Sequence, residues 1–242
     1  MQHQIVSRSE WLKARKDFLT KEKAFTRARD QLGAERRALP WVKLHKPYVF
    51  DMPEGEKSLG ELFDGRSQLL VYHFMLGPGW IEGCPSCSYL ADHFDGMLPH
   101  LKQRDVTFAA ISRAPLPEID VYQRRMGWQF PWASSFGNDF NFDFGVSFKL
   151  DGNGHGRGTY NFEEQDLTSD EMPGLSAFYK DEHGDIFHTY SAYARGLDSL
   201  VGTYNFLDLA PRGRDEDKLP WTMAWVRRHD EYDEARPRAS CC

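Results

Sequence analysis

Two cysteines separated by two residues, Cys84 and Cys87, are the side chains of this sequence best suited to chemistry. Thiols at this spacing either cycle between dithiol and disulfide or bind a metal ion. An apolar run precedes them at 69–75 and a helical pattern follows from 85, so Cys84 is expected at a helix start, where backbone N–H groups and the helix dipole favour a thiolate. We therefore predict Cys84 as nucleophile and Cys87, one turn on and less accessible, as resolving thiol.

The residues around the two cysteines bear on their reactivity. Pro85 lacks an N–H and suits the first position of a helix. Ser86 could donate to a sulfur through its hydroxyl or its backbone. Glu82 would disfavour a thiolate if its carboxylate faced the sulfurs, so the redox poise is not predicted.

Several aromatic residues and one histidine could also belong to the site. Trp80 is an equal candidate for a wall of the site or for core packing, and Trp128 and Trp132 favour the core. His73, in the preceding strand, is interpreted as a core histidine satisfied by hydrogen bonding. A proton acceptor for the buried thiol is the alternative.

A second pair of thiols, Cys241 and Cys242, ends the sequence. The simpler interpretation is two exposed thiols without a function. The alternative is a shuttle that exchanges electrons with the first pair or captures a soft metal ion. Adjacent cysteines lack the usual ligand spacing of structural zinc sites, so we predict no metal and no cofactor.

Bulk composition limits the classes of protein to consider. The chain has 242 residues, of which 40% are hydrophobic and 14% aromatic, enough for one elaborated domain and an arm. The start lacks the features of a secretory signal and no apolar run reaches a membrane span, so we expect a cytoplasmic protein without a membrane partner. A net charge of -6 opposes nucleic-acid binding.

The N-terminal arm, residues 1–40, is predicted to be a long amphipathic helix that ends near Gly33. It begins with the capping box Ser7–Glu10. Its apolar stripe recurs every seventh residue, at Trp11, Phe18, Phe25 and Leu32. Such a stripe usually docks on its own domain, and a homodimer arm is the alternative.

Residues 41–210 are predicted to form one α/β domain and residues 211–242 a tail. We expect a strand at 66–76, a helix at 85–103, a strand at 106–111 and a short helix at 117–126. An inserted loop or hairpin occupies about 137–172, and two extended runs around 181–184 predict a hairpin. A final helix is expected near 194–204.

This order of elements resembles the thioredoxin-like fold, with a central mixed sheet flanked by helices, here with an N-terminal helical extension and an insertion. In such proteins a cis-proline opens the hairpin strand and lies against the disulfide. Pro173 stands in the matching place. The resemblance thus implies a third site residue.

At finer grain the chain resembles an uncharacterised bacterial thioredoxin-like family, domain of unknown function 899, described as predicted dithiol-disulfide oxidoreductases. The resemblance rests on the segments 62–66, 83–88, 109–115, 127–128 and 131–135. The chain is also distantly similar to peroxiredoxins. However, the proline and hydroxyl residue that precede their attacking cysteine are replaced by Gly77 and Ile81 for Cys84, or by Trp80 and Cys84 for Cys87.

The expected function is therefore a thiol-disulfide oxidoreductase acting on a protein or small-molecule disulfide or thiol, with an unidentified electron donor. A thiol peroxidase is the first alternative. A non-catalytic thioredoxin-like module for binding or redox sensing is the second.

Overall fold

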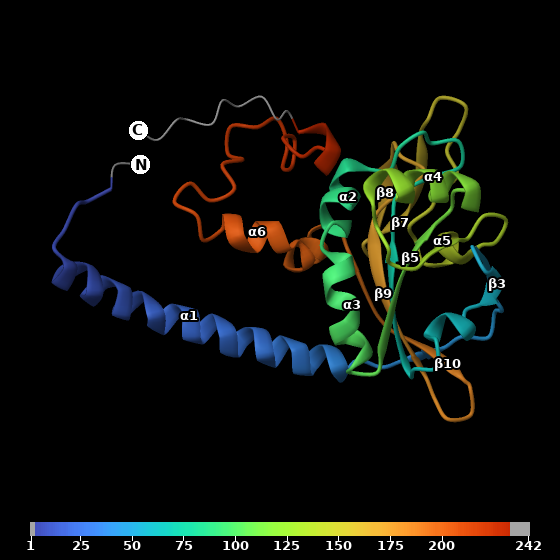
Figure 1. Ribbon diagram of the computed structural model, residues 1–242, viewed down its shortest axis with the longest axis horizontal. Coiled ribbons are helices and arrows are strands. Elements are labelled where there is room, and N and C mark those ends of the chain that lie inside the picture. Colours follow the sequence, from blue (N-terminus) through green and yellow to red (C-terminus); the bar gives the residue numbers. More distant parts are fainter. Residues whose placement is uncertain (1–2, 233–242) are drawn as a thin grey trace. The chain divides into compact units, whose positions relative to one another are not determined.

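The computed structural model describes residues 3–232. The chain divides into two compact units, Met1–Trp41 and Val42–Cys242, and each is described by itself. Figure 1 follows the chain through both units.

The first unit is built on one long helix, α1 (Arg8–Arg37). The predicted capping box is present: Ser7 N–H donates to Glu10 Oε2 (2.9 Å) and Glu10 N–H donates to Ser7 Oγ (3.3 Å). The helix continues past Gly33, its predicted end, because one interior glycine costs only about 1 kcal/mol. No residue of α1 is buried, and its apolar stripe is exposed. Pairing of two copies through this stripe stays a prediction.

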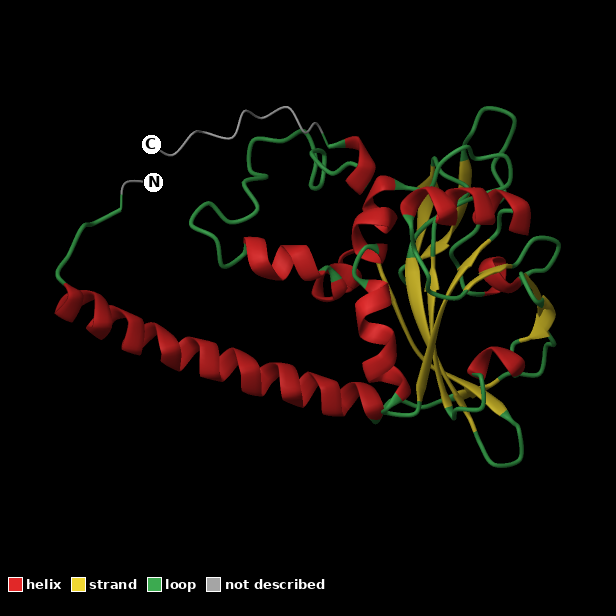
Figure 2. Cartoon of the chain, in the orientation of Figure 1, coloured by secondary structure: helices red, strands yellow, loops and turns green. Residues whose placement is uncertain are grey.

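The second unit contains an eight-stranded mixed sheet with strand order β1-β10-β9-β4-β5-β6-β2-β3. The strands are β1 (Val42–Lys43), β2 (Val49–Met52), β3 (Gly55–Ser58), β4 (Gln68–His73), β5 (Val106–Ser112), β6 (Trp132–Ser134), β9 (Gly174–Lys180) and β10 (Ile186–Tyr193). β4, β5 and β6 are parallel neighbours, and the remaining pairings are antiparallel. Figure 2 shows the strands crossing one another in a strongly twisted sheet.

Four helical segments lie along the chain between β3 and β6 and pack on the sheet. They are η1 (Glu61–Phe63), α2 (Pro85–Ala91), α3 (Phe94–Lys102) and α4 (Leu116–Met126). The predicted helix at 85–103 is thus two helices, which lie end to end beside the strands (Figure 1). The break falls at Asp92, whose carboxylate accepts a hydrogen bond from Trp128 Nε1 (2.9 Å) and lies 2.7 Å from His229 Nδ1.

The connectivity of these elements makes the fold thioredoxin-like, as predicted. A strand (β4), a helix pair and a parallel strand (β5) form the first half. The β9–β10 hairpin then adds to the free side of β4, with Gly174 opposite His73 and Leu175 opposite Tyr72. The carboxyl end of β4, from which the cysteine loop continues, therefore lies beside the start of β9.

The side chains of β4 alternate between two hydrophobic clusters, as the period of a strand requires. Tyr72 packs with α2, α3 and α4 on one face. Leu69 and Val71 pack with β2, η1 and α5 (Phe140–Asp143) on the other. The two faces of one central strand thus belong to separate parts of the core.

The predicted insertion contains α5 and a separate two-stranded hairpin, β7 (Gly156–Tyr160) and β8 (Glu163–Leu167). The helix predicted near 194–204 is instead a 3-10 segment, η2 (Ala194–Leu200), followed by α6 (Gly202–Leu207). A further 3-10 turn, η3 (His229–Glu231), lies near the end of the described chain.

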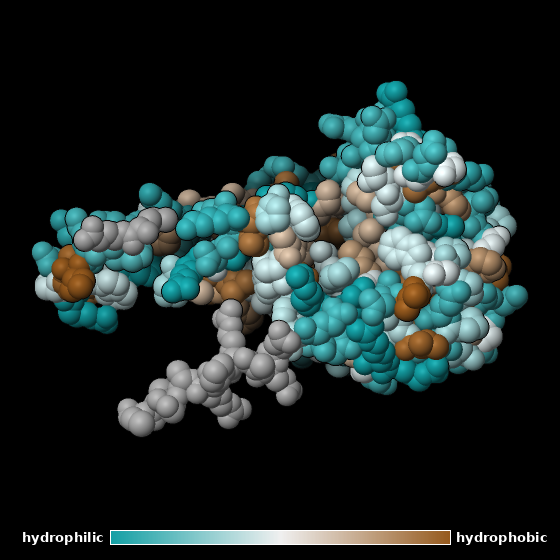
Figure 3. Space-filling model, turned by 90° about the horizontal axis from the view of Figure 1, so that it is seen from above, coloured by the Kyte–Doolittle hydropathy of each residue, from teal (hydrophilic) through white to brown (hydrophobic). Residues whose placement is uncertain are grey.

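The surface agrees with a core buried inside the domain. Figure 3 shows a face on which hydrophobic residues come mostly as isolated spots in a hydrophilic surround. Across residues 3–232, no helix has the length and apolarity needed to cross a bilayer.

Candidate active site

The loop between β4 and α2 brings the cysteines to the carboxyl end of the central strand. It folds back on itself, because the Cys84 N–H donates to the Met75 carbonyl (3.1 Å). Gly83 makes this path possible: a Cβ at this position would lie 2.5 Å from Phe74 Cε1 and 2.7 Å from Tyr122 Cε1. Cys84 is the N-cap of α2, and Pro85 occupies its first turn.

The two thiols differ in accessibility in the direction that the sequence predicted. Both are free cysteines. Cys84 is partly exposed, whereas Cys87 is 1% exposed and belongs to the core cluster of α2, α3 and α4. Cys84 is therefore the more accessible of the two thiols.

The surroundings of the two sulfurs shift their pKa values in opposite directions. The pKa of Cys84 is lowered to about 6, first by a hydrogen bond with the Cys87 thiol and further by the backbone N–H groups of Cys87 and Ser86 and the charge of Arg228, against the effect of burial. Burial raises the pKa of Cys87 well above its ordinary value, and the neighbouring Cys84 adds to this. The surroundings therefore favour the thiolate at Cys84 and the thiol at Cys87.

Two tyrosines lie on the inner side of the dithiol. The Tyr72 hydroxyl forms a hydrogen bond with Cys87, and burial raises the tyrosine's pKa, so this hydroxyl keeps its proton. Tyr160, at the end of β7, is also close enough for Cys87 to contribute to the rise of its pKa, of which burial is the main cause. The buried thiol thus has a tyrosine hydroxyl as hydrogen-bond partner.

Pro173 lies directly before β9, as the fold resemblance implied, but its peptide bond is trans. No peptide bond in residues 3–232 is cis, so the expected cis-proline is wrong for this structure. The Pro173 carbonyl accepts a hydrogen bond from the Tyr160 hydroxyl (2.8 Å), which itself accepts one from the Ala194 N–H (2.9 Å). Tyr160 therefore lies between the start of the hairpin and the dithiol.

Arg228, from the segment predicted to be a tail, contacts the loop that carries the cysteines. Its Nη2 and Nε atoms donate to the Gly83 carbonyl (2.8 and 3.1 Å), and Nε also donates to the Tyr122 hydroxyl (3.1 Å). Its Nη1 atom bonds Glu231 (2.8 Å) and Glu82 (3.0 Å). The residue immediately before the nucleophile is thus held by a guanidinium group.

Glu82, which could have opposed the thiolate, is paired instead. Its carboxylate contacts Arg125 Nη1 (2.5 Å) and Arg228 Nη1 (3.0 Å). Two positive charges therefore offset its negative charge.

The remaining predicted residues divide between the site and the core. Trp80 is partly buried against the core cluster that contains Cys87. His73 is 1% exposed on the opposite face of β4, where its Nε2 lies 2.9 Å from Ser176 Oγ, and burial lowers its pKa to about 3. Cys241 and Cys242 lie outside the described residues.

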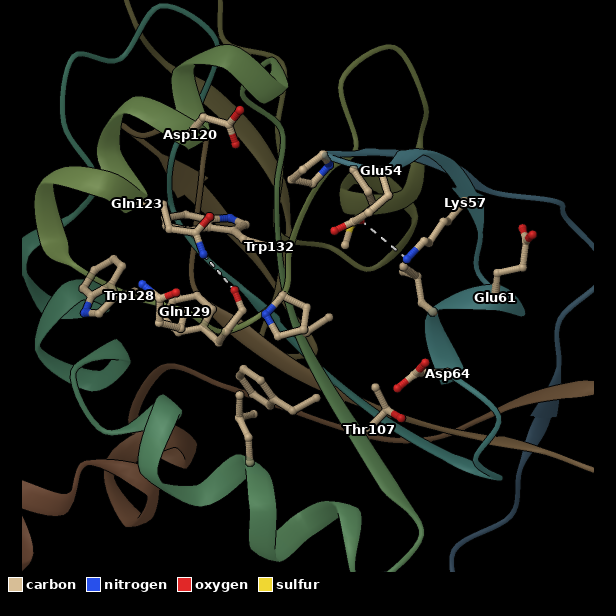
Figure 4. Close-up of a pocket in the computed structure, with 18 of the residues that line it drawn as sticks. Glu54, Lys57, Glu61, Asp64, Thr107, Asp120, Gln123, Trp128, Gln129 and Trp132 are labelled. Carbon is tan, nitrogen blue, oxygen red and sulfur yellow. Dashed lines mark hydrogen bonds and ion pairs between the residues drawn. The ribbon is translucent and has the colours of Figure 1, made fainter.

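Trp128 and Trp132 are core residues that also line a cavity without the cysteines. This cavity of about 580 Å³ lies among α4, β6 and the β2–β3 hairpin, with the carboxylates of Glu54 and Asp64 on one side and Gln123 on the other (Figure 4). Neither cysteine lines it. In residues 3–232, no three His, Cys, Asp or Glu side chains form a cluster that could hold a metal ion.

Three residues near the dithiol were not predicted from the sequence: Tyr72, Tyr160 and Arg228. Tyr72 could have been found, because strand alternation places it on the face that the cysteine helix covers. No sequence pattern pointed to the others: Tyr160 lies in the insertion, and Arg228 is 145 residues from Gly83.

The family "Bacterial protein of unknown function (DUF899)" matches residues 1–232. No curated protein matches the chain.

Among solved structures, the peroxidoxin BcpB from Mycobacterium tuberculosis is similar at 13% identity and a TM-score of 0.46, over 68% of this chain and 95% of that one. Peroxiredoxin Q from Xanthomonas campestris is similar at 12% and 0.42, over 64% and 87%. A putative protein disulfide isomerase from Bacteroides thetaiotaomicron is similar at 16% and 0.39, over 69% and 91%.

Proposed function

Since this chain belongs to DUF899, a family of bacterial proteins of unknown function, we propose its activity from its own site: a thiol-disulfide oxidoreductase with Cys84 as nucleophile and Cys87 as resolving thiol. The observation that carries the proposal is the opposite character of the two sulfurs. One is partly exposed with a lowered pKa, and the other is buried with a raised pKa. This division suits a two-step exchange.

In the first step the Cys84 thiolate attacks one sulfur of a substrate disulfide. A bond forms between Cys84 Sγ and that sulfur, and the substrate's sulfur–sulfur bond breaks. The other substrate sulfur leaves as a thiolate and takes a proton from water. The pKa of Cys84, about 6, keeps the attacking form populated at neutral pH.

In the second step Cys87 gives its proton to water and attacks Cys84 Sγ. The Cys84–Cys87 bond forms and the second substrate sulfur leaves as a thiolate. The substrate has gained two electrons, and an external thiol donor must return the protein to the dithiol. The Tyr72 hydroxyl, bonded to Cys87, supports the sulfur as negative charge develops on it.

The proposal is tested with Cys84→Ser and Cys87→Ser, each in a background carrying Cys241→Ser and Cys242→Ser so that no tail thiol takes part. We expect Cys84→Ser to lose reduction of a protein disulfide. Cys87→Ser should accumulate a mixed disulfide at Cys84, visible by intact-protein mass spectrometry. Unchanged turnover by Cys84→Ser would refute the proposal.

The same variants separate this activity from peroxide reduction. Stopped-flow mixing of the reduced protein with hydrogen peroxide and with a protein disulfide compares the two rates directly. We expect the disulfide to react faster. Fast consumption of peroxide that depends on one cysteine would instead make the protein a thiol peroxidase.

A further inference from the structure

The C-terminal clamp, defined as residues 225–232, is fixed to the domain on both sides of Arg228. On one side Val226 is 3% exposed in the core, and the Trp225 ring lies 5.6 Å from that of Tyr89. On the other side Asp230 bonds Arg125 (2.7 Å). The position of Arg228 is therefore set by packing as well as by its own hydrogen bonds.

The clamp reaches the nucleophile through a continuous set of hydrogen bonds. Arg228 donates to the Gly83 carbonyl and to the Tyr122 hydroxyl. That hydroxyl lies 2.8 Å from Ser88 Oγ, and Ser88 Oγ donates to the Cys84 carbonyl (2.9 Å). The carbonyl groups of Cys84 and of the residue before it are thus both tied to one guanidinium.

The charges around the guanidinium are arranged asymmetrically. Glu82 and Glu231 bond its Nη1 edge, while Nε and Nη2 face the cysteine loop. Arg125 bonds Asp230, Glu82 and Glu231, so it shares both glutamates with Arg228. Positive charge is therefore presented to the loop that carries Cys84, whose titratable neighbours besides Arg228 include Cys87 and Tyr72.

We infer that Arg228 is a positioning residue for Cys84, held in place by the packing of Trp225 and Val226 and by the ion pair of Asp230. The guanidinium fixes the backbone from Gly83 to Cys84 and places positive charge beside the nucleophile. Without it the loop would lose two backbone hydrogen bonds and its nearest cation. The inference deepens the proposed function and rests on it for the role of Cys84.

The test measures the ionisation of Cys84 without any substrate, in the Cys241→Ser and Cys242→Ser background. The pH midpoint is read from the rate of iodoacetamide alkylation, assigned to Cys84 by peptide mass spectrometry. Arg228→Gln removes the charge and Arg228→Lys keeps it. Arg227→Gln is the matched control, because this exposed neighbour donates to the carbonyls of Ala224 and Val226.

We expect Arg228→Gln to raise the midpoint by about one pH unit, the effect of losing an adjacent opposite charge. Alkylation below the midpoint then falls about tenfold. Arg228→Lys should recover part of the shift, and Arg227→Gln should match the parent protein. A parent-like midpoint for a folded Arg228→Gln, or the same shift in Arg227→Gln, would overturn the inference.

A second variant covers the case in which Arg228→Gln does not fold. Tyr122→Phe keeps the ring and removes only the hydroxyl between Arg228 and Ser88, and a smaller upward shift is expected. In that case a parent-like midpoint for a folded Tyr122→Phe would overturn the inference. Alkylation needs no turnover, so this result stays readable even if Cys84→Ser shows that the proposed function is wrong.

Discussion

Tyr72 and His73 are neighbours in β4, and both are almost fully buried, yet their polar atoms serve different ends. Tyr72 faces α2, where its hydroxyl bonds the Cys87 thiol. His73 faces the other side, in a chain of hydrogen bonds through Ser176 and Ser191 to His188, each step between 2.8 and 2.9 Å. One face of the strand directs a polar group at the Cys87 thiol, whereas the other directs one into a chain of side-chain hydrogen bonds.

The charged groups at this end of the sheet also differ between the two faces. On the face of β4 that carries Tyr72, Arg228 lies beside the partly exposed Cys84. On the other side, Arg113 pairs with Glu171, which is 1% exposed and accepts a hydrogen bond from Ser147 Oγ (2.8 Å). A buried polar group therefore indicates a reaction site only where an accessible reactive atom lies close to it.

The largest expected effect is a difference between the two faces of β4 in how stability depends on pH. Burial raises the pKa of Glu171 from 4.5 to about 7, so its contribution to the free energy of unfolding is full below pH 4.5 and is lost as the pH rises through 7, a loss of about 3 kcal/mol. Glu171→Gln should remove this loss. Chemical denaturation of both proteins at pH 5 and pH 8 measures it.

Cys84 should act in the opposite direction. Its pKa is lowered from 9 to about 6, so its contribution to stability grows as the pH rises from 6 to 9. Cys84→Ser therefore serves as the companion of Glu171→Gln in the same experiment. If the free energy of unfolding changed equally with pH in the two variants, the two faces of β4 would not differ in this way.

Gly83→Ala should disturb the thiol side alone. Its Cβ would lie 2.5 Å from Phe74 Cε1, and such overpacking costs about 2 kcal/mol. We expect a lower free energy of unfolding and a raised midpoint of Cys84 alkylation. Gly96→Ala in α3 is the control, because a Cβ there meets no atom within 4 Å. An unchanged midpoint in a destabilised Gly83→Ala would separate loop geometry from reactivity.

Tyr72→Phe should slow the second step of the exchange. Loss of the hydrogen bond to Cys87 is worth about 1 kcal/mol, which corresponds to a resolution rate several-fold lower. Quenched-flow measurement of the mixed disulfide gives this rate. Ser176→Ala removes the hydroxyl next to His73 on the other face, at a similar cost in stability, and should leave the rate unchanged. Equal slowing by both variants would show that general loosening is the cause.

The smallest effect is expected from ending the chain after Tyr232. This truncation removes Cys241 and Cys242 but keeps the residues that bond Arg228. We expect an unchanged alkylation profile of Cys84 and unchanged disulfide reduction. A marked loss of turnover would favour the electron shuttle that the sequence left as the alternative for the tail thiols.

The elements of the fold could be predicted largely from local patterns. Strands β4 and β5, helix α4 and the β9–β10 hairpin lie where apolar periodicity and turn residues predicted them. The break between α2 and α3 was missed because it coincides with contacts from Trp128 and His229 to Asp92, which are distant in the sequence. The trans bond of Pro173 was missed because the expectation came from a family resemblance.

Local sequence patterns alone were enough to predict the dithiol and the order of its two thiols. The spacing of Cys84 and Cys87, the proline between them and the strand before them are local, so they alone place one thiol at a helix start and the other in its first turn. Only the tertiary structure decided what surrounds the sulfurs. Tyr160 and Arg228 come from segments far along the chain, and side-chain packing, which local periodicity does not encode, brings them to the dithiol.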